Sequence, residues 1–333
     1  MIGPRKIYPE PRAGLDFYVR SLSEYLSSQG FSVEVVCHPA WCPKIHHLDT
    51  FTYGLWASWK ACFTKGIIHY HGGAALFAWI PRLFGKKVFV TLHSRESKAQ
   101  HISHPLRLFY RLAEKMGIQS AHHISAVSQT LQKELMRDYK KEVTHIPMGI
   151  KPAFCDSAGE LNRLGLEPKK YILFLGRLAP GKGIELLLKA KTSYPIVIAG
   201  APLYDKNYLA ALKQQAPKNV IFLGNVTGLL KRELLAHALI YIQASENEGA
   251  SIALLEALSF GLPLLVSDIA QNRELVGNAG VFFRTRDASD FQKKLEALLD
   301  EPQTLKTLGE KARDHIAQNC AWDDKKLTAF FDR

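Results

Sequence analysis

The chain has 333 residues, of which 47% are hydrophobic and 22% charged; this composition excludes a disordered chain and leaves room for two folded cores. The formal net charge is +12, and residues 1–150 carry +9 of it together with 11 of the 13 histidines. A basic surface favours an anionic partner, namely phosphorylated lipid head groups, an anionic glycan or nucleic acid.

We expect neither a secretion signal nor a membrane span in this sequence. No positively charged start precedes an apolar segment, and the longest weakly polar run, 66–80, is too short to cross a bilayer. The five cysteines form no CxxC pair, which suits a reducing compartment. We expect a cytoplasmic protein, with peripheral binding at the inner face of the cytoplasmic membrane as one role for its basic charge.

Strands and helices alternate along the first half of the chain, which is typical of α/β domains. The chain starts abruptly at Met1–Gly3. Apolar runs predict strands at 31–37, 67–73, 87–92, 121–127 and 143–146. Periodic apolar positions predict helices at 16–29, 74–83, 105–117 and 129–139, the last with Ser128 as its N-cap.

A group of cysteines and histidines could be written as a metal site: Cys37, Cys42, His46 and His47. Their spacing matches no standard zinc pattern, and Cys37 ends an apolar strand, where buried thiols are common. We therefore favour a structural role for these residues and expect no bound metal.

One histidine follows the carboxyl end of a predicted strand. His93, with Ser94 beside it, comes directly after the strand at 87–92. Open α/β sheets bind ligands outside the carboxyl ends of their strands, so we predict that His93 is functional. We interpret His69 and His71 as packing or turn residues.

The helix at 105–117 carries Arg107, Arg111 and Lys115 at every fourth position, and Leu108, Phe109 and Leu112 are its apolar residues. A basic amphipathic helix can bind an anionic membrane. An ordinary solvated helix face explains the same pattern, and both interpretations stay open.

The second half repeats the alternation after an irregular connection at 151–169. Strands are expected at 171–175, 196–200, 220–223, 239–242, 264–266 and 280–283, and helices at 203–215, 229–236, 251–260, 291–299 and 304–319, followed by a terminal helix. Two doubly wound, Rossmann-like α/β domains facing across a cleft are therefore predicted.

The loop after the strand at 171–175 nearly spells a P-loop, Gly-x4-Gly-Lys, from Gly176 to Lys182. A P-loop needs Ser or Thr after the lysine to hold magnesium, and Gly183 stands there instead. No apolar strand ending in aspartate follows at 195–200. We therefore reject the P-loop interpretation.

The stretch 241–276 is the most informative. A polar loop, 245–249, leaves the carboxyl end of a strand and enters a helix, where unpaired N–H groups and the helix dipole favour an anion such as phosphate. Gly249, Ala250 and Ser251 complete the approach to that helix. Glu248 and Glu256 remain free to accept hydroxyl protons from a sugar or ribose. An ordinary crossover with solvated glutamates is the alternative for this stretch taken alone.

The residues of this stretch and their spacing resemble a known sequence motif. Glu248 and Glu256 are separated by seven residues, preceded by Ser245 and followed by Gly-Leu-Pro at 261–263, Ser-Asp at 267–268 and the tail 272–276. This pattern resembles the Glu-x7-Glu motif of the retaining glycosyltransferases of family 4, which have the GT-B fold and include enzymes of bacterial surface polysaccharide and lipopolysaccharide synthesis. The resemblance covers nearly the whole chain and is more specific in the second half.

The resemblance implies a role for each motif around the sugar donor. In the Gly-Arg-Leu…Lys-Gly segment, Arg177 and Lys182 would neutralise the nucleotide diphosphate as it leaves. Gly14 would let the backbone approach the donor phosphates, and the backbone at Val226 would contact the nucleobase. The same family pattern places an acceptor-binding domain at 1–149, a nucleotide-sugar domain at 150–318, and a terminal segment, 319–333, that returns to the first domain.

The remaining implied roles concern the sugar. Glu256 would bind the ribose hydroxyls, Glu248 the hydroxyls of the transferred sugar, and His93 would lie near that sugar and the acceptor. The implied reaction moves a sugar from a UDP- or GDP-sugar to a hydroxyl of a glycan or lipid-linked acceptor, with retention of configuration. No Asp-x-Asp motif lies at a strand end, so we expect no metal and no cofactor besides the donor substrate.

Two other classes of function remain open. A nucleotide-sugar epimerase or a phosphorylase can use the same architecture, although the pyridoxal-phosphate lysine expected of a phosphorylase has no clear motif here. A non-catalytic basic module that binds membrane or nucleic acid would explain the charge, but no nucleic-acid recognition motif is present.

Overall fold

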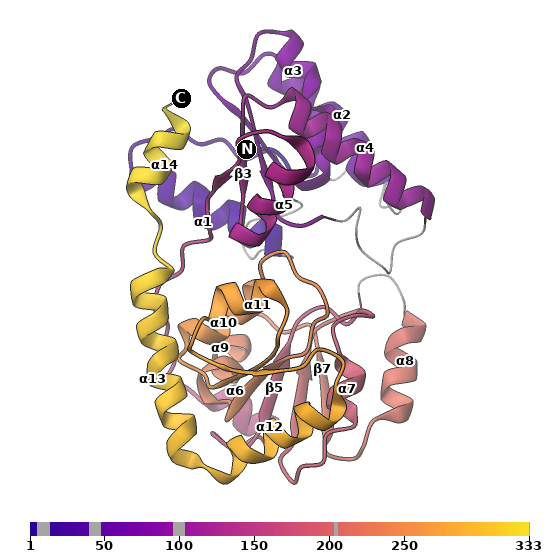
Figure 1. Cartoon of the computed structure of the whole chain (residues 1–333), viewed down its shortest axis with the longest axis vertical. Coiled ribbons are helices and arrows are strands. Elements are labelled where there is room, and N and C mark those ends of the chain that lie inside the picture. Colours follow the sequence, from indigo (N-terminus) through magenta and orange to yellow (C-terminus); the bar gives the residue numbers. More distant parts are fainter. Residues whose placement is uncertain (5–13, 40–47, 96–103, 203–205, 333) are drawn as a thin grey trace. The chain divides into compact units, whose positions relative to one another are not determined.

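The computed structural model describes residues 1–4, 14–39, 48–95, 104–202 and 206–332 (Figure 1). The chain divides into two compact units, one formed by residues 1–149 with 322–333 and the other by residues 150–321. Each unit contains a parallel β-sheet whose strands are connected through helices. The predicted class of two doubly wound α/β domains is confirmed.

The first unit contains a four-stranded sheet in the order β1 (Ile68–His71), β2 (Val88–Leu92), β3 (His123–Ala126), β4 (Thr144–His145). Residues of β1 and β2 are buried throughout, as expected for a parallel sheet covered on both faces. The carboxyl ends of these strands therefore define one edge of the unit, and His71 and His93 lie at that edge.

The start of the chain extends this sheet by a single residue. Ile2 bridges both Val36 and Tyr70 in parallel, and it donates its N–H to the carbonyl of His69 at 2.8 Å. The predicted strand at 31–37 is wrong in its extent, because within it Val36 alone forms a bridge. The start of the chain pairs through a single residue, Ile2. It can therefore form a β-bridge with only one residue of the segment 31–37, and that residue is Val36.

The helices of the first unit agree less closely with the predictions. They are α1 (Gly14–Ser28), α2 (Leu48–Ala61), the 3-10 helix η1 (Gly72–Phe77), α3 (Trp79–Leu83), α4 (His104–Ser120) and α5 (Gln129–Tyr139). Helix α2 was not predicted. The expected helix at 74–83 is split, because Pro81 lacks an N–H and fits only the first turn of a new helix. On α4, two of the three apolar positions, Leu108 and Leu112, are 64% and 52% exposed, whereas Phe109 is partly buried against the core of the first unit.

The second unit contains six strands: β5 (Ile172–Leu175), β6 (Ile196–Ala199), β7 (Val220–Gly224), β8 (Ile240–Gln243), β9 (Leu264–Ser267) and β10 (Val281–Phe283). Their order in the sheet is β10-β9-β8-β5-β6-β7. The chain thus winds outward in both directions from β5, and the order reverses between β5 and β8. Ligands of open α/β sheets bind at such a switch point.

Helices α6 (Gly159–Arg163), α7 (Ile184–Leu188), α8 (Lys206–Gln215), α9 (Gly228–His237), α10 (Ile252–Ser259), α11 (Ala270–Val276), α12 (Ala288–Asp300) and α13 (Pro302–Asn319) complete the second unit. Helix α6 lies inside the stretch expected to be an irregular connection. The fully buried Glu233 accepts hydrogen bonds from the N–H groups of Glu160 and Leu161 at 2.8 and 3.1 Å. A distant carboxylate therefore satisfies the start of α6.

The last helix, α14 (Asp324–Phe331), packs within the first unit. Its Phe330 and Phe331 rings lie 5.0 and 5.9 Å from that of Phe89 on β2. Trp322 approaches Gly149 so closely that a Cβ at this glycine would lie 2.4 Å from the indole ring. In the described part of the chain, no helix combines the length and apolarity that a bilayer span requires.

Candidate functional site

Two loops predicted to act together lie against each other in the second unit. One follows β5 and contains the segment 176–183; the other follows β8 and leads into α10. Glu246 donates its N–H to the carbonyl of Gly181 at 2.9 Å. A Cβ on Gly183 would lie 2.3 Å from the carbonyl oxygen of Ala244. Glycine at this position therefore permits the two loops to touch.

Lys182 and Glu248 form the centre of this site. Lys182 Nζ lies 2.6 Å from Glu248 Oε1, and the two side chains are 18% and 12% exposed. The same oxygen accepts hydrogen bonds from Ser245 Oγ at 2.7 Å and from Gln243 Nε2 at 3.3 Å. Within the described chain Oε2 has no protein partner, so this oxygen is available to a ligand hydroxyl.

Gln243 connects the glutamate to the start of α10 and was missed by sequence reasoning. Its side chain is buried, and its Oε1 accepts a hydrogen bond from Ser251 Oγ at 2.9 Å. Ser251 also caps the helix by accepting the N–H of Leu254. A polar residue at the carboxyl end of an otherwise apolar strand was the available signal for Gln243.

Glu256 is held by a cation that the sequence did not reveal. Lys231 Nζ, from α9, lies 2.6 Å from Glu256 Oε1, and the glutamate side chain is 11% exposed. Burial raises the pKa of Tyr241 well above its usual value, and the charges of Glu248 and Glu256 raise it further. The charges of both glutamates therefore disfavour ionisation of the same buried hydroxyl, that of Tyr241 on β8.

The other predicted donor residues take different positions. Arg177 is exposed in the loop after β5 and forms no ion pair with any described residue of the protein. Val226 follows β7 and is 7% exposed. Gly249, Ala250 and Ser251 are partly exposed at the entrance to α10. The guanidinium of Arg177 and the start of α10 are thus accessible at the same edge of the sheet as Lys182.

His93 lies in the first unit, where the structure gives it an unexpected partner. His71 Nδ1 and His93 Nε2 are 3.1 Å apart, and the ring of Tyr18 packs edge-on against His93 at 4.7 Å. Burial lowers the pKa of His93 to about 3, so this histidine is neutral at physiological pH. The interpretation of His71 as a packing or turn residue is therefore incomplete. Gly14 begins α1 in the same unit and is exposed.

The burial of His71 indicates which nitrogen carries its proton. His71 is fully buried, and its Nε2 has no partner in the described chain. Buried N–H groups without an acceptor are rarer than buried acceptors without a donor. A proton on Nδ1 avoids that cost and donates to His93 Nε2, which leaves the proton of His93 on its own Nδ1. His93 would then present an N–H donor to a ligand.

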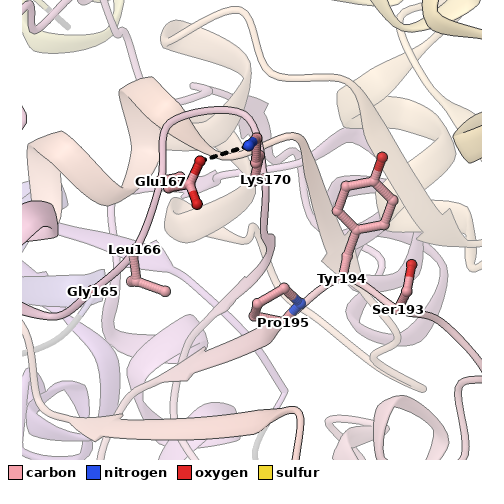
Figure 2. A pocket seen from close by; sticks show the side chains of 7 residues that line it. All are labelled: Gly165, Leu166, Glu167, Lys170, Ser193, Tyr194 and Pro195. Carbon is pink, nitrogen blue, oxygen red and sulfur yellow. Dashed lines mark ion pairs between the residues drawn. The ribbon is translucent and has the colours of Figure 1, made fainter.

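A surface hollow in the second unit lies elsewhere (Figure 2). It is lined by Gly165, Leu166, Glu167, Lys170, Ser193, Tyr194 and Pro195. These residues precede β5 and β6, so the hollow lies at the amino ends of the strands and contains none of the predicted site residues. Within the described ranges no group of three His, Cys, Asp or Glu side chains is arranged to hold a metal ion; Cys42, His46 and His47 lie outside those ranges.

Two family models match this chain: "Glycosyl transferases group 1" over residues 160–315 and "Glycosyltransferase Family 4" over residues 13–154. D-rhamnosyltransferase WbpZ of Pseudomonas aeruginosa is 26% identical over 269 residues, which cover 76% of this chain and 69% of that protein. O-antigen chain mannosyltransferase B of Escherichia coli is 27% identical over 152 residues, which cover 42% of this chain and 40% of that protein.

Among solved structures, Anabaena Alr3699/HepE in complex with UDP and glucose is similar, with a TM-score of 0.75 at 17% identity. The similarity covers 96% of this chain and 94% of that one. This similarity confirms the predicted fold, and the two family models confirm the predicted enzyme class.

Proposed function

The chain belongs to the group 1 and family 4 glycosyltransferases and has their GT-B fold, and from this premise we propose that it transfers a sugar from a UDP- or GDP-sugar to a hydroxyl of a glycan or lipid-linked acceptor, retaining the anomeric configuration. The observation that carries the proposal is the contact of Lys182 with Glu248 where the loops after β5 and β8 meet. Two relatives are named for sugar transfer, one of them to an O-antigen chain, which supports a role in surface polysaccharide or lipopolysaccharide assembly.

The diphosphate is the group that must be stabilised as it leaves. In the proposed reaction the bond between the anomeric carbon and the phosphate oxygen breaks, and Arg177 and Lys182 neutralise the negative charge that develops on that oxygen. The accessible start of α10 adds backbone N–H groups and a helix dipole of the same sign. Lys182 is held by Glu248, so its position is set before a donor binds.

The glutamates and the first unit orient the sugar. Glu248 keeps Oε1 on Lys182 and offers Oε2 to a hydroxyl of the transferred sugar, while Glu256 accepts ribose hydroxyls and the backbone at Val226 contacts the base. The acceptor hydroxyl attacks from the face that the diphosphate leaves, which retains configuration, and its proton passes to the departing phosphate oxygen. His93 donates a hydrogen bond to the sugar or the acceptor, and Gly14 admits the donor phosphates.

A nucleotide-sugar screen tests the proposal directly. A ligand that binds the folded state raises its melting temperature in proportion to ln(1 + [L]/Kd), so UDP- and GDP-sugars are compared first by thermal shift. The stabilising donor is then incubated with acceptors. Release of UDP or GDP together with an α-linked product from an α-linked donor supports retaining transfer; a changed sugar without nucleotide release indicates an epimerase.

Chelation is expected to leave the reaction intact. Because two cationic side chains neutralise the leaving group in the proposed site, turnover in the presence of EDTA should equal turnover without it. The measurement is the initial rate of nucleotide release before and after dialysis against EDTA. Activity that disappears with the chelator and returns with a divalent cation would overturn this part of the proposal.

His71 is expected to act through His93. Leucine and asparagine have similar shapes, but asparagine can donate an N–H from nearly the position of His71 Nδ1. We expect His71→Asn to retain kcat within about twofold, and His71→Leu to lose about fivefold in kcat, because one hydrogen bond contributes about 1 kcal/mol. Equal kcat values for the two variants at equal melting temperature would contradict a positioning role.

The proposal includes peripheral binding to an anionic membrane. The net charge of +9 in residues 1–150 supports it, because each basic group near an anionic surface contributes about 1 kcal/mol.

A further inference from the structure

Exposed apolar side chains gather on one group of helices in the first unit. Nine large hydrophobic residues there are at least 40% exposed: Phe51, Leu55, Trp59, Phe63, Trp79, Leu83, Phe84, Leu108 and Leu112. They belong to α2, α3, α4 and the turns that follow α2 and α3, and these three helices pack side by side (Figure 1). Single exposed apolar residues are ordinary, whereas a cluster of them marks an interaction surface.

The centre of this cluster is built from two neighbouring turns. The ring of Trp59 lies 5.6 Å from that of Phe63 and 6.0 Å from that of Phe84. Lys86 Nζ donates to the carbonyl of Thr64 at 2.7 Å and joins the turn after α2 to the turn after α3. Phe63 and Leu83 are the most exposed members, at 70% and 76%. We call Trp59, Phe63, Leu83 and Phe84 the aromatic tip.

The charges around the aromatic tip are mostly positive, and the acidic Glu34 is paired at 2.9 Å with Lys60, the residue next to Trp59. Residues 50–95 contain no aspartate or glutamate, and Lys65, Arg82 and Lys87 beside the tip are all exposed. Two copies of the chain docked through this surface would place like charges together, which disfavours self-association. Trp and Phe side chains mixed with Lys and Arg match the boundary between head groups and acyl chains of an anionic bilayer.

We propose that the aromatic tip inserts into the interface of an anionic membrane, with Lys65, Arg82 and Lys87 bound to lipid head groups. The inference rests on the membrane part of the proposed function and names the contacting surface, whereas the sequence suggested the whole basic domain, with the helix at 105–117 as one candidate element. Membrane binding through the aromatic tip does not depend on the sugar-transfer reaction. Leu108 and Leu112 extend the apolar surface onto α4, where Arg111 and Lys115 are exposed between and beside them.

Vesicle co-sedimentation of the full chain without sugar substrates tests the proposal, so that its failure is separate from a failure of the transfer reaction. Vesicles of phosphatidylcholine with phosphatidylglycerol are compared with phosphatidylcholine alone. We expect the anionic vesicles to bind more tightly, and the double variant Phe63→Ser/Leu83→Ser to bind them at least about tenfold more weakly, because two buried apolar side chains are lost. The matched control is Phe154→Ser in the second unit, where the phenylalanine is 77% exposed and its loss should leave vesicle binding unchanged.

A charge variant separates the two parts of the surface. Lys65→Glu/Lys87→Glu should remove the preference for anionic vesicles. Unchanged binding by the Phe63→Ser/Leu83→Ser variant, or equal loss with Phe154→Ser, would overturn the proposal. So would size-exclusion chromatography showing a wild-type dimer that the double variant converts to a monomer, since the tip would then be a protein interface.

Discussion

Lys182→Ala is expected to lower kcat about a hundredfold to a thousandfold, the range seen when one preorganised group that stabilises developing negative charge is removed. Lys182 is largely buried in the loop after β5 and is fixed by Glu248 at 2.6 Å, so no solvent reorganisation is needed when the diphosphate leaves. Glu248→Gln keeps the shape of the side chain but removes the charge that holds Lys182 and weakens acceptance of the sugar hydroxyl. We expect a loss of similar size.

The folded state should survive both changes. Leaving the partner group without its ion pair costs about 1–3 kcal/mol, which is less than the usual free energy of unfolding of about 5–15 kcal/mol. Nucleotide release and the melting temperature are measured together. Lys170→Ala is the control, because Lys170 pairs with Glu167 in an exposed position at the amino ends of the strands. Near-normal rates in Lys182→Ala would remove the lysine from the proposed reaction.

The second large effect is expected at Gly183, with Gly181 as a matched control two residues away. Both glycines have positive φ, 70° and 82°, so alanine costs about 1–2 kcal/mol at either position from backbone strain. A Cβ on Gly183 would also lie 2.3 Å from the carbonyl oxygen and 2.5 Å from the Cβ of Ala244, whereas a Cβ on Gly181 meets no atom within 4 Å. Overpacking adds about 1–3 kcal/mol more for Gly183→Ala alone.

Function should separate these two variants further. Gly183→Ala pushes the loop of Lys182 away from the loop of Glu248, so donor binding measured by calorimetry should be lost. Gly181→Ala should bind the donor with little change. Urea unfolding gives the stability of each variant. Equal losses of stability and binding in the two variants would show that the contact between the loops is unimportant.

Most of the sequence predictions that the structure confirms depended on patterns of residues close together in the chain. Ser128 and Ser251 were recognisable as helix starts, since an N-cap depends on residues within one turn. The strands of the second unit were placed within one or two residues, because each is a short apolar run between turns. The glycine-rich loop after β5 was visible for the same reason.

The features that were missed depend on partners far along the chain. Helix α6 is anchored by Glu233, and Glu256 pairs with Lys231 from another helix. His71 meets His93 across the ends of two strands. Helix α2 was missed because Leu55 and Trp59 occupy its exposed face, which hides the alternation of polar and apolar faces that sequence reasoning uses. No local pattern reports such contacts.

The return of α14 to the first unit has a consequence for how the protein is made. A ribosome completes the entire second unit before it releases the residues that cover Phe89 and His69. Part of the sheet of the first unit therefore stays uncovered until α14, the last segment of that unit to be translated, has been synthesised. Chaperones would bind this uncovered surface on the nascent polypeptide. A tag or deletion at α14 would destabilise the first unit, although most of that unit is encoded at the opposite end of the gene.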